Sequence, residues 1–171
     1  MSEQLGYEGK VAVITGGGRG LGRAYALLLG ARGARVVIND PGVSMQGDGL
    51  DTGPAEQVAA EIRAAGGDAA ANTDTVATPE GGQAIIESAL DHFGSVDILI
   101  HNAGIVRRAP LAEMTSEEFE SVLDVHLRGG FNVLRPAFAS MCKNRYGRVV
   151  MTGSINALYG NANVVNYSTA K

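Results

Sequence analysis

Three side chains near the end of the printed sequence could do chemistry together: Ser154, Tyr167 and Lys171. Tyr167 and Lys171 are four residues apart, so on a helix their side chains lie on the same face. A tyrosine beside a lysine ammonium ionises more easily than a free phenol, whose pKa is about 10. A serine hydroxyl opposite that phenol could hold a carbonyl or alcohol oxygen while the phenol moves the proton. The trio therefore predicts a site that interconverts alcohols and ketones, and it requires a hydride carrier bound elsewhere.

Strands and helices in alternation must position these side chains. Short apolar runs, typical of strands buried on both faces, occur at residues 10–15, 34–39, 68–73, 96–101 and 147–152. Helical patterns separate them at residues 23–32, 54–65, 79–93 and 115–144, the last opened by a capping-box sequence. This order predicts an α/β fold, a Rossmann-type doubly wound parallel sheet with helices on both faces and sites at the carboxyl ends of the strands. We expect one domain over residues 1–171.

A glycine-rich turn joins the first expected strand to the first expected helix. Its backbone amides could approach a pyrophosphate at the helix N-terminus, although glycines also form ordinary turns. The cofactor contacts predicted in this turn are Gly16, Arg19, Gly20, Leu21 and Gly22.

Asp40 ends the next strand, twenty residues beyond Gly20. A carboxylate there could accept both ribose hydroxyls of a dinucleotide and would repel a 2′-phosphate, which favours NAD over NADP. Arg19 favours the opposite preference, because a guanidinium could bind that phosphate. We predict NAD as the cofactor, with NADP less favoured; a turn residue before Pro41 is the alternative role for Asp40.

Two further strand ends carry candidate cofactor contacts. Asp74 could accept a hydrogen bond from the adenine amino group, and a helix cap or a solvated carboxylate is the alternative. Asn102, Ala103 and Gly104 follow the fourth strand directly. We expect Asn102 to tie backbone groups of neighbouring strands, and the small residues after it to let the cofactor lie against the chain; a simple turn is the alternative.

Together these residues resemble the short-chain dehydrogenase/reductase family. Thr15-Gly-Gly-Gly-Arg-Gly-Leu-Gly22 resembles its TGxxxGxG cofactor motif, Asn102-Ala-Gly104 its NAG motif, and Ser154 with Tyr167-x-x-x-Lys171 its catalytic motif. The resemblance implies that Tyr167 is the general acid/base and that Ser154 positions the substrate oxygen. It also implies that Lys171 lowers the tyrosine pKa and holds the nicotinamide ribose, so Tyr167 and Lys171 count among the expected cofactor contacts.

Other stretches, such as Val125-His-Leu-Arg-Gly129, resemble the (3R)-hydroxyacyl-CoA dehydrogenase branch of the family. Most members carry an asparagine where this chain has His126, and the backbone there holds a water of the proton relay. We interpret His126 as a buried, hydrogen-bonded histidine, with a second acid/base group as the alternative. Gly129-Gly130 weakens the helix just beyond it and permits a local kink.

Composition narrows the possible partners and location. The chain has 18 acidic and 14 basic residues, which argues against nucleic acid or an anionic membrane as its main partner. No apolar run approaches membrane length, and the one cysteine permits no internal disulfide. We expect a cytoplasmic protein without a metal site that acts on a small alcohol, ketone or acyl thioester. By resemblance, the complete chain is expected to form a homodimer or homotetramer.

The family continues past the lysine with the rest of that helix, two more strands and a mobile substrate lid. We therefore expect this chain, which stops at Lys171, to be C-terminally incomplete. The predicted function is NAD(P)-dependent interconversion of a secondary alcohol and a ketone, with a 3-hydroxyacyl thioester as a candidate substrate. The alternative is a non-catalytic dinucleotide-binding module, or an inactive fragment of such an enzyme.

Overall fold

A parallel sheet forms the centre of the protein. The computed structural model describes residues 5–44, 46–47 and 53–171. Within them the strands are β1 (Val11–Thr15), β2 (Arg35–Asn39), β3 (Asp68–Asn72), β4 (Ile98–His101) and β5 (Arg148–Met151). They pair in the order β3-β2-β1-β4-β5, all parallel. The connections diverge from β1 in opposite directions, so the switch point that favours a ligand crevice lies at the carboxyl ends of β1 and β4.

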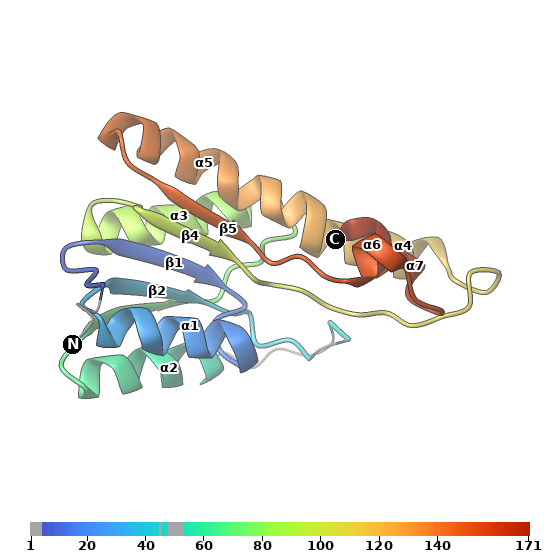
Figure 1. The fold of residues 1–171 in the computed structure, drawn as a ribbon, viewed down its shortest axis with the longest axis horizontal. Helices are drawn as coiled ribbons and strands as arrows, with labels where there is room; N and C mark the ends of the chain where they lie inside the picture. The colour runs from blue at the N-terminus through green and yellow to red at the C-terminus, as the bar shows by residue number, and fades with distance from the viewer. Residues whose placement is uncertain (1–4, 45, 48–52) are drawn as a thin grey trace.

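Helices cover both faces of this sheet (Figure 1). One face carries α1 (Gly20–Ala31) and α2 (Gly53–Ala64), and the other carries α3 (Pro79–Phe93) and α5 (Gly129–Asn144). Side chains alternate along β1: Ala12 and Ile14 pack into the first core, and Val11 and Val13 pack into the second. The predicted doubly wound α/β fold is confirmed, and the apolar strand runs follow from burial on both faces.

The long helix expected over residues 115–144 contains an irregular turn. It begins as α4 (Ser116–Leu123), whose N-cap Thr115 and residue Glu118 form the predicted capping box. A π-helical turn, Asp124–Arg128, then leads into α5, and the Gly129 N–H donates to the Asp124 carbonyl. The helix therefore widens just before the glycine pair, and the widened turn contains His126. Single π turns inside α-helices occur frequently at functional sites.

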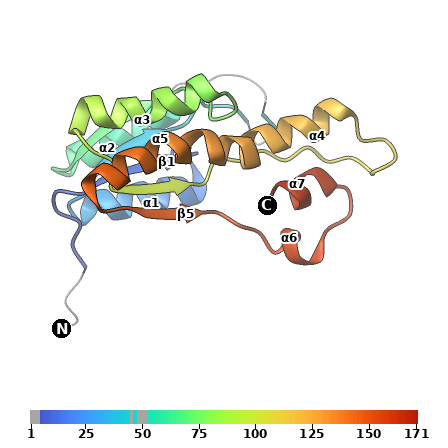
Figure 2. The ribbon, with the colours of Figure 1, turned by 90° about the horizontal axis from the view of Figure 1, so that it is seen from above.

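The last segment of the chain lies across the carboxyl end of the sheet. Beyond β5, the short helices α6 (Asn156–Tyr159) and α7 (Val165–Ala170) pack against each other, and α7 also packs against α4 (Figure 2). Strand β5 forms the edge of the sheet, and its residues Val149, Val150 and Met151 are 40–49% exposed.

Two sequence predictions differ from the structure or fall partly outside it. The first helix begins at Gly20 rather than at residue 23, so the helix starts inside the glycine-rich turn. The loop predicted over residues 41–53 includes residues 45 and 48–52, which lie outside the described residues. Of the helices in the described ranges, none is both long enough and apolar enough to cross a bilayer.

Candidate active site

The glycine-rich turn after β1 packs closely against the segment after β4. Gly16 has a left-handed backbone, with φ of 62°, and a Cβ built there would lie 2.8 Å from the Ala103 Cα. A Cβ on Gly22 would lie 2.0 Å from the Gly16 carbonyl oxygen. Neither position can accept a side chain without displacing backbone, so these glycines permit both the turn and its close contact with the next loop.

The first turn of α1 is suited to bind a phosphate. Arg19 occupies the N-cap of α1, but its guanidinium donates to the Val43 carbonyl, 3.2 Å away, instead of capping the helix. The amides of a helix N-terminus attract anions, and the turn at Gly20 leaves room above them. The turn thus has the geometry that a pyrophosphate requires.

One hydroxyl joins the two loops. Thr15 Oγ1 accepts hydrogen bonds from the backbone N–H groups of Asn102 (3.2 Å) and Ala103 (3.1 Å). In return, Asn102 Nδ2 donates to the Gly16 carbonyl at 3.1 Å. These bonds close the seam between β1 and β4 where the strand order reverses.

The Asp40 carboxylate is held by backbone at the end of β2. Its Oδ2 accepts from the Gly18 N–H at 2.9 Å and its Oδ1 from the Gly42 N–H at 2.8 Å. The residue is 8% exposed. Each oxygen retains a lone pair for a further donor, so the fixed carboxylate could still accept hydroxyl groups of a ligand.

A cavity of about 710 Å³ opens at the carboxyl ends of the strands. Most of the predicted cofactor contacts line it, namely Gly16, Arg19, Gly20, Asp40, Asn102, Ala103 and Gly104. The other predicted cofactor contacts, namely Leu21, Gly22, Asp74, Tyr167 and Lys171, are not among its lining residues. Leu21 is 61% exposed, and Gly22 acts by packing against Gly16.

Asp74 is exposed, and its contacts are local. Its carboxylate accepts from Asn72 Nδ2 at 2.7 Å, and its backbone N–H donates to Asn72 Oδ1 at 3.0 Å. It does not cap α3, because Thr78 occupies that N-cap and accepts from the Gly81 N–H. The structure therefore excludes the capping alternative for Asp74 and leaves its carboxylate exposed.

Asn39 lines the cavity and was not singled out from the sequence. The residue is fully buried, and its Nδ2 donates to Asn72 Oδ1 and to the Asp74 carbonyl, both at 2.8 Å. Within the described part of the chain its Oδ1 is buried without a partner. A buried acceptor without a donor is costly, and here it belongs to a residue that lines the cavity. The sequence feature that could have pointed to Asn39 is its position as the polar last residue of an apolar strand.

These features fit a nicotinamide dinucleotide. The uncapped turn at Gly20 could hold its pyrophosphate, and Asp40 could hold its adenosine ribose. The orphaned Asn39 oxygen and the glycine contacts also indicate a wall shaped for a close-lying ligand.

Tyr167 and Lys171 lie on one side of the last helical turn. The Lys171 backbone N–H donates to the Tyr167 carbonyl at 3.1 Å, which is the i→i−4 bond of a helix. The Lys171 Nζ lies 5.7 Å from the Tyr167 ring centroid and donates to the Thr152 carbonyl at 2.7 Å. Partial burial lowers the pKa of Lys171 below its usual value.

Ser154 lies between β5 and α6, two residues beyond the Thr152 that binds Lys171. Its half-buried hydroxyl accepts from the Asn156 N–H at 3.2 Å. No hydrogen bond among the described residues joins Ser154 to Tyr167 or Lys171. The structure thus brings Tyr167 and Lys171 together directly, and Ser154 only through their shared neighbourhood at the end of β5.

Tyr167 shares a wall with the cavity. It belongs to an apolar group whose buried members are Ile105, Val122 and Ala170, and whose partly buried members also include Val43, Leu123 and Val125. Ile105, Val43 and Val125 also line the cavity. These three side chains therefore belong both to the apolar group around Tyr167 and to the lining of the cavity.

Two histidines are buried beside this wall. His101 is 4% exposed and His126 is 6% exposed. Burial lowers the pKa of each to about 4, and the Lys171 charge contributes in the same direction. Both rings are therefore neutral near pH 7. His126 Nε2 contacts the Ile105 backbone, so His126 is the buried, hydrogen-bonded histidine favoured by the sequence rather than a freely titrating group.

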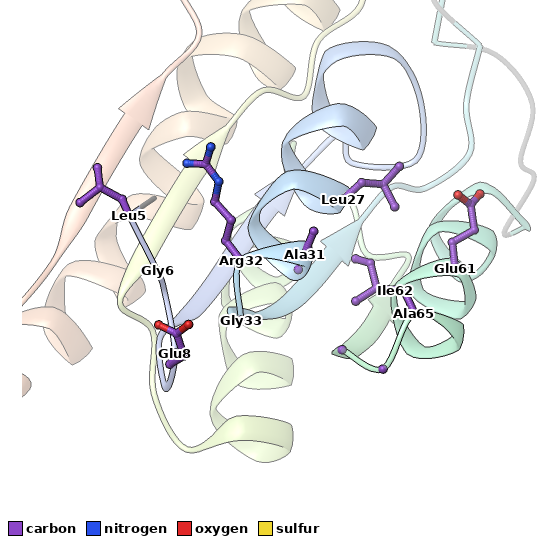
Figure 3. Close-up of a pocket in the computed structure, with 13 residues that line it drawn as sticks. Leu5, Gly6, Glu8, Leu27, Ala31, Arg32, Gly33, Glu61, Ile62 and Ala65 are labelled. Carbon is purple, nitrogen blue, oxygen red and sulfur yellow. The ribbon is translucent and has the colours of Figure 1, made fainter. Parts of the chain in front are cut away.

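A second cavity, of about 460 Å³, opens at the opposite end of the strands (Figure 3). The N-terminal segment and the C-terminal ends of α1 and α2 form its walls, with Glu8, Arg32 and Glu61 as the charged residues. None of the predicted site residues lines it.

The fold and the cavity define a class, the doubly wound α/β proteins with a crevice at the switch point of the sheet that suits a dinucleotide. The sequence model of the family described as "short chain dehydrogenase" matches residues 10–171. The chain belongs to the short-chain dehydrogenase family, so the family predicted from the motifs is confirmed.

Relatives and a solved structure agree with this assignment. The chain is 44% identical over 171 residues to peroxisomal multifunctional enzyme type 2 of Mus musculus, covering 100% of this chain and 23% of that protein. It is 37% identical over 162 residues to 3-oxoacyl-[acyl-carrier-protein] reductase of Synechocystis, covering 95% of this chain and 62% of that protein. A crystal structure of a short chain dehydrogenase from Mycobacterium avium superposes with a TM-score of 0.86 at 42% identity, over 95% of this chain and 60% of that chain.

The chain thus spans about a quarter of the length of the mouse protein and less than two thirds of the others. The predicted cytoplasmic location is wrong, because relatives from four organisms are named as peroxisomal proteins. The composition could not reveal this, since the residues that direct a protein to an organelle need not alter overall charge or hydropathy.

The buried histidines predict how stability depends on pH. An unfolded chain protonates histidine near pH 6.5, whereas the folded chain resists protonation until about pH 4. Stability from the two neutral rings is therefore complete above pH 6.5 and is lost as the pH falls towards 4. The unfolding free energy, measured by urea titration, should fall by about 1.4 kcal/mol per pH unit for each histidine. His101→Gln should reduce this slope by about 1.4 kcal/mol per pH unit, the contribution of one histidine. An unchanged slope would contradict the assignment.

Proposed function

We propose that this chain carries the active site of an oxidoreductase that interconverts a secondary alcohol and a ketone with NAD as cofactor. The observation that carries the proposal is the wall shared by Tyr167 and the cavity, in which Ile105 contacts both. Lys171 lies beside the same ring. A proton donor and a hydride carrier would thereby face one substrate carbon and its oxygen from adjacent positions.

In this proposal Tyr167 exchanges the proton, and Lys171 supports both the tyrosine and the cofactor. The bound nicotinamide dinucleotide supplies the hydride exchange. Tyr167 gives its proton to the carbonyl oxygen in reduction and takes it back in oxidation. The Lys171 charge, fixed by the Thr152 carbonyl, stabilises the phenolate that forms in between, and its remaining N–H groups can hold a ribose hydroxyl.

Ser154 would hold the substrate oxygen. Its hydroxyl accepts from the Asn156 N–H, so its own proton stays free to be donated. Donation from Ser154 to the oxygen on which charge develops is the stabilisation that this reaction needs.

The proposed substrate class is a 3-oxoacyl or 3-hydroxyacyl thioester. The Synechocystis relative is named a 3-oxoacyl-[acyl-carrier-protein] reductase. The resemblance of Val125-His-Leu-Arg-Gly129 to hydroxyacyl-CoA dehydrogenases supports the same class.

We also propose that the complete protein forms a homo-oligomer through the long helix. Leu127, Phe131 and Phe138 are 57–61% exposed and, at spacings of four and seven residues, lie on one face of that helix. An apolar stripe of this kind favours a helix partner. Sedimentation of the complete protein should give a dimer or tetramer, and Phe138→Glu should shift it towards monomer; a monomeric parent protein would contradict this.

Tyr167→Phe tests the chemistry. Loss of the phenol proton should lower kcat by about 100-fold or more. The affinity for NADH, measured by fluorescence titration, should change by less than about twofold, because the ring still packs against Ile105. The control Tyr146→Phe also removes one phenol oxygen, but Tyr146 lies just before β5 with its ring beside Lys10. This variant should leave kcat unchanged.

Full turnover by Tyr167→Phe would contradict the proposed role of this residue. NADH binding without turnover by the complete parent protein, assayed with secondary alcohols and 3-hydroxyacyl thioesters, would instead favour the non-catalytic module.

Asp40→Asn tests the cofactor preference. It removes the negative charge but retains an oxygen that can accept from the Gly18 or Gly42 N–H. The ratio of kcat/KM with NAD to kcat/KM with NADP should fall by about tenfold or more, a difference of about 1.4 kcal/mol. Asp68→Asn makes the same charge change at the exposed start of β3 and should leave the ratio unaltered. An equal ratio in parent and Asp40→Asn would exclude Asp40 as the discriminating group.

A further inference from the structure

His101 is buried between the cofactor loop and the irregular turn of the long helix. Its Nδ1 lies 3.0 Å from Thr15 Oγ1, and its Nε2 lies 3.2 Å from the His126 carbonyl oxygen. Thr15 directly precedes the glycine-rich turn, and His126 lies in the π-helical turn. One imidazole therefore spans the distance between two elements that belong to different parts of the site.

The hydrogen-bond network determines which nitrogen of His101 carries the proton. Thr15 Oγ1 already accepts two backbone N–H groups, from Asn102 and Ala103. A hydroxyl has two lone pairs and one proton, so the remaining capacity of Thr15 is to donate that proton to His101 Nδ1. The His101 proton must then be on Nε2, from which it is donated to the His126 carbonyl.

The His126 carbonyl belongs to a residue that reaches the catalytic tyrosine. The His126 ring meets the Tyr167 ring edge to face, with centroids 5.1 Å apart. Its Nε2 lies 3.1 Å from the Ile105 amide nitrogen and 2.9 Å from the Ile105 carbonyl oxygen. A Cβ on Gly104 would lie 2.2 Å from the His126 Cε1, so the ring is also pressed against the floor of the cavity.

The π turn interrupts the regular i→i−4 bonding of the long helix, since the Gly129 N–H donates to the Asp124 carbonyl five residues back. His126 lies inside this turn, and its carbonyl receives a donor from outside the helix. His101 supplies that donor. The orientation of the His126 peptide in turn sets where its ring meets Tyr167.

We propose that His101 is a positioning residue for the reaction, acting through the His126 carbonyl and ring to hold Tyr167 against the cofactor cavity. The proposal rests on the proposed function for the meaning of Tyr167, but its central contact can be tested separately. His101 touches neither substrate nor cofactor in this account. Its neutral ring suits the role, because burial lowers its pKa and a second positive charge would repel Lys171.

The proton position of His101 can be measured directly. The chain has three histidines, so ¹⁵N-labelled histidine with single substitutions assigns each ring by NMR. At pH 7 His101 should be neutral with its proton on Nε2. A proton on Nδ1 would remove the bond to the His126 carbonyl and overturn the proposal, whatever the enzymatic activity.

Two polar variants in the complete protein distinguish the roles of the two ring nitrogens of His101. His101→Gln can place an N–H near the former Nε2, whereas His101→Asn reaches only the former Nδ1. The Asn variant should lower kcat by between about twofold and tenfold, the factor that one neutral hydrogen bond is worth. The Gln variant should stay within about twofold of the parent, and KM and the NADH dissociation constant should change little in either variant.

Three results would overturn the proposal. They are an unchanged kcat in His101→Asn, an equal loss in both variants, or a loss confined to NADH affinity, which would place the role of His101 in the cofactor loop. If the parent protein shows no turnover, the proposed function fails instead, and the NMR measurement still decides whether His101 binds the His126 carbonyl.

Discussion

The hydroxyl of Thr15 is the contact on which the rest of the site depends. It accepts hydrogen bonds from the backbone N–H groups of Asn102 and Ala103, and the Asn102 side chain in turn donates to the Gly16 carbonyl of the glycine-rich turn. Parallel pairing of β1 with both β2 and β4 brings these loops together at the point where the strand order reverses. The crevice is thus a consequence of topology, and the hydrogen bonds of Thr15 fix the backbone that lines it.

The second constraint is the layer of apolar side chains between cavity and catalytic helix. Ile105 lines the cavity and also packs against Tyr167, while His126 binds the Ile105 backbone and meets the Tyr167 ring. A change in the helix at His126 would therefore move the tyrosine and the cavity floor together. The irregular turn therefore lies beside the apolar group that contains Tyr167 and lines the cavity.

The sequence predicted the fold because its strands are buried on both faces and its helices begin at recognisable signals, as at Thr115. It predicted the proximity of Tyr167 and Lys171 because helical spacing is local information. Asn39 and His101 could not be found in the same way. Each lies at the end of a strand, and its hydrogen bonds join segments that are 25 or more residues apart along the chain, which spacing alone does not reveal.

The predicted cytoplasmic location was wrong because overall charge and hydropathy do not indicate the organelle in which a protein resides. The cofactor preference rests on one charge, that of Asp40, against the guanidinium of Arg19, and their distances to a ligand are set by loops rather than by spacing.

A crystal structure of the complete protein with NAD bound tests the central claim most directly. The account predicts the pyrophosphate over the amides of the Gly16–Gly20 turn and the nicotinamide ring between Ile105 and the Tyr167 hydroxyl. A dinucleotide seated in the cavity beside Glu8 and Arg32, or a nicotinamide ring turned away from Tyr167, would contradict it.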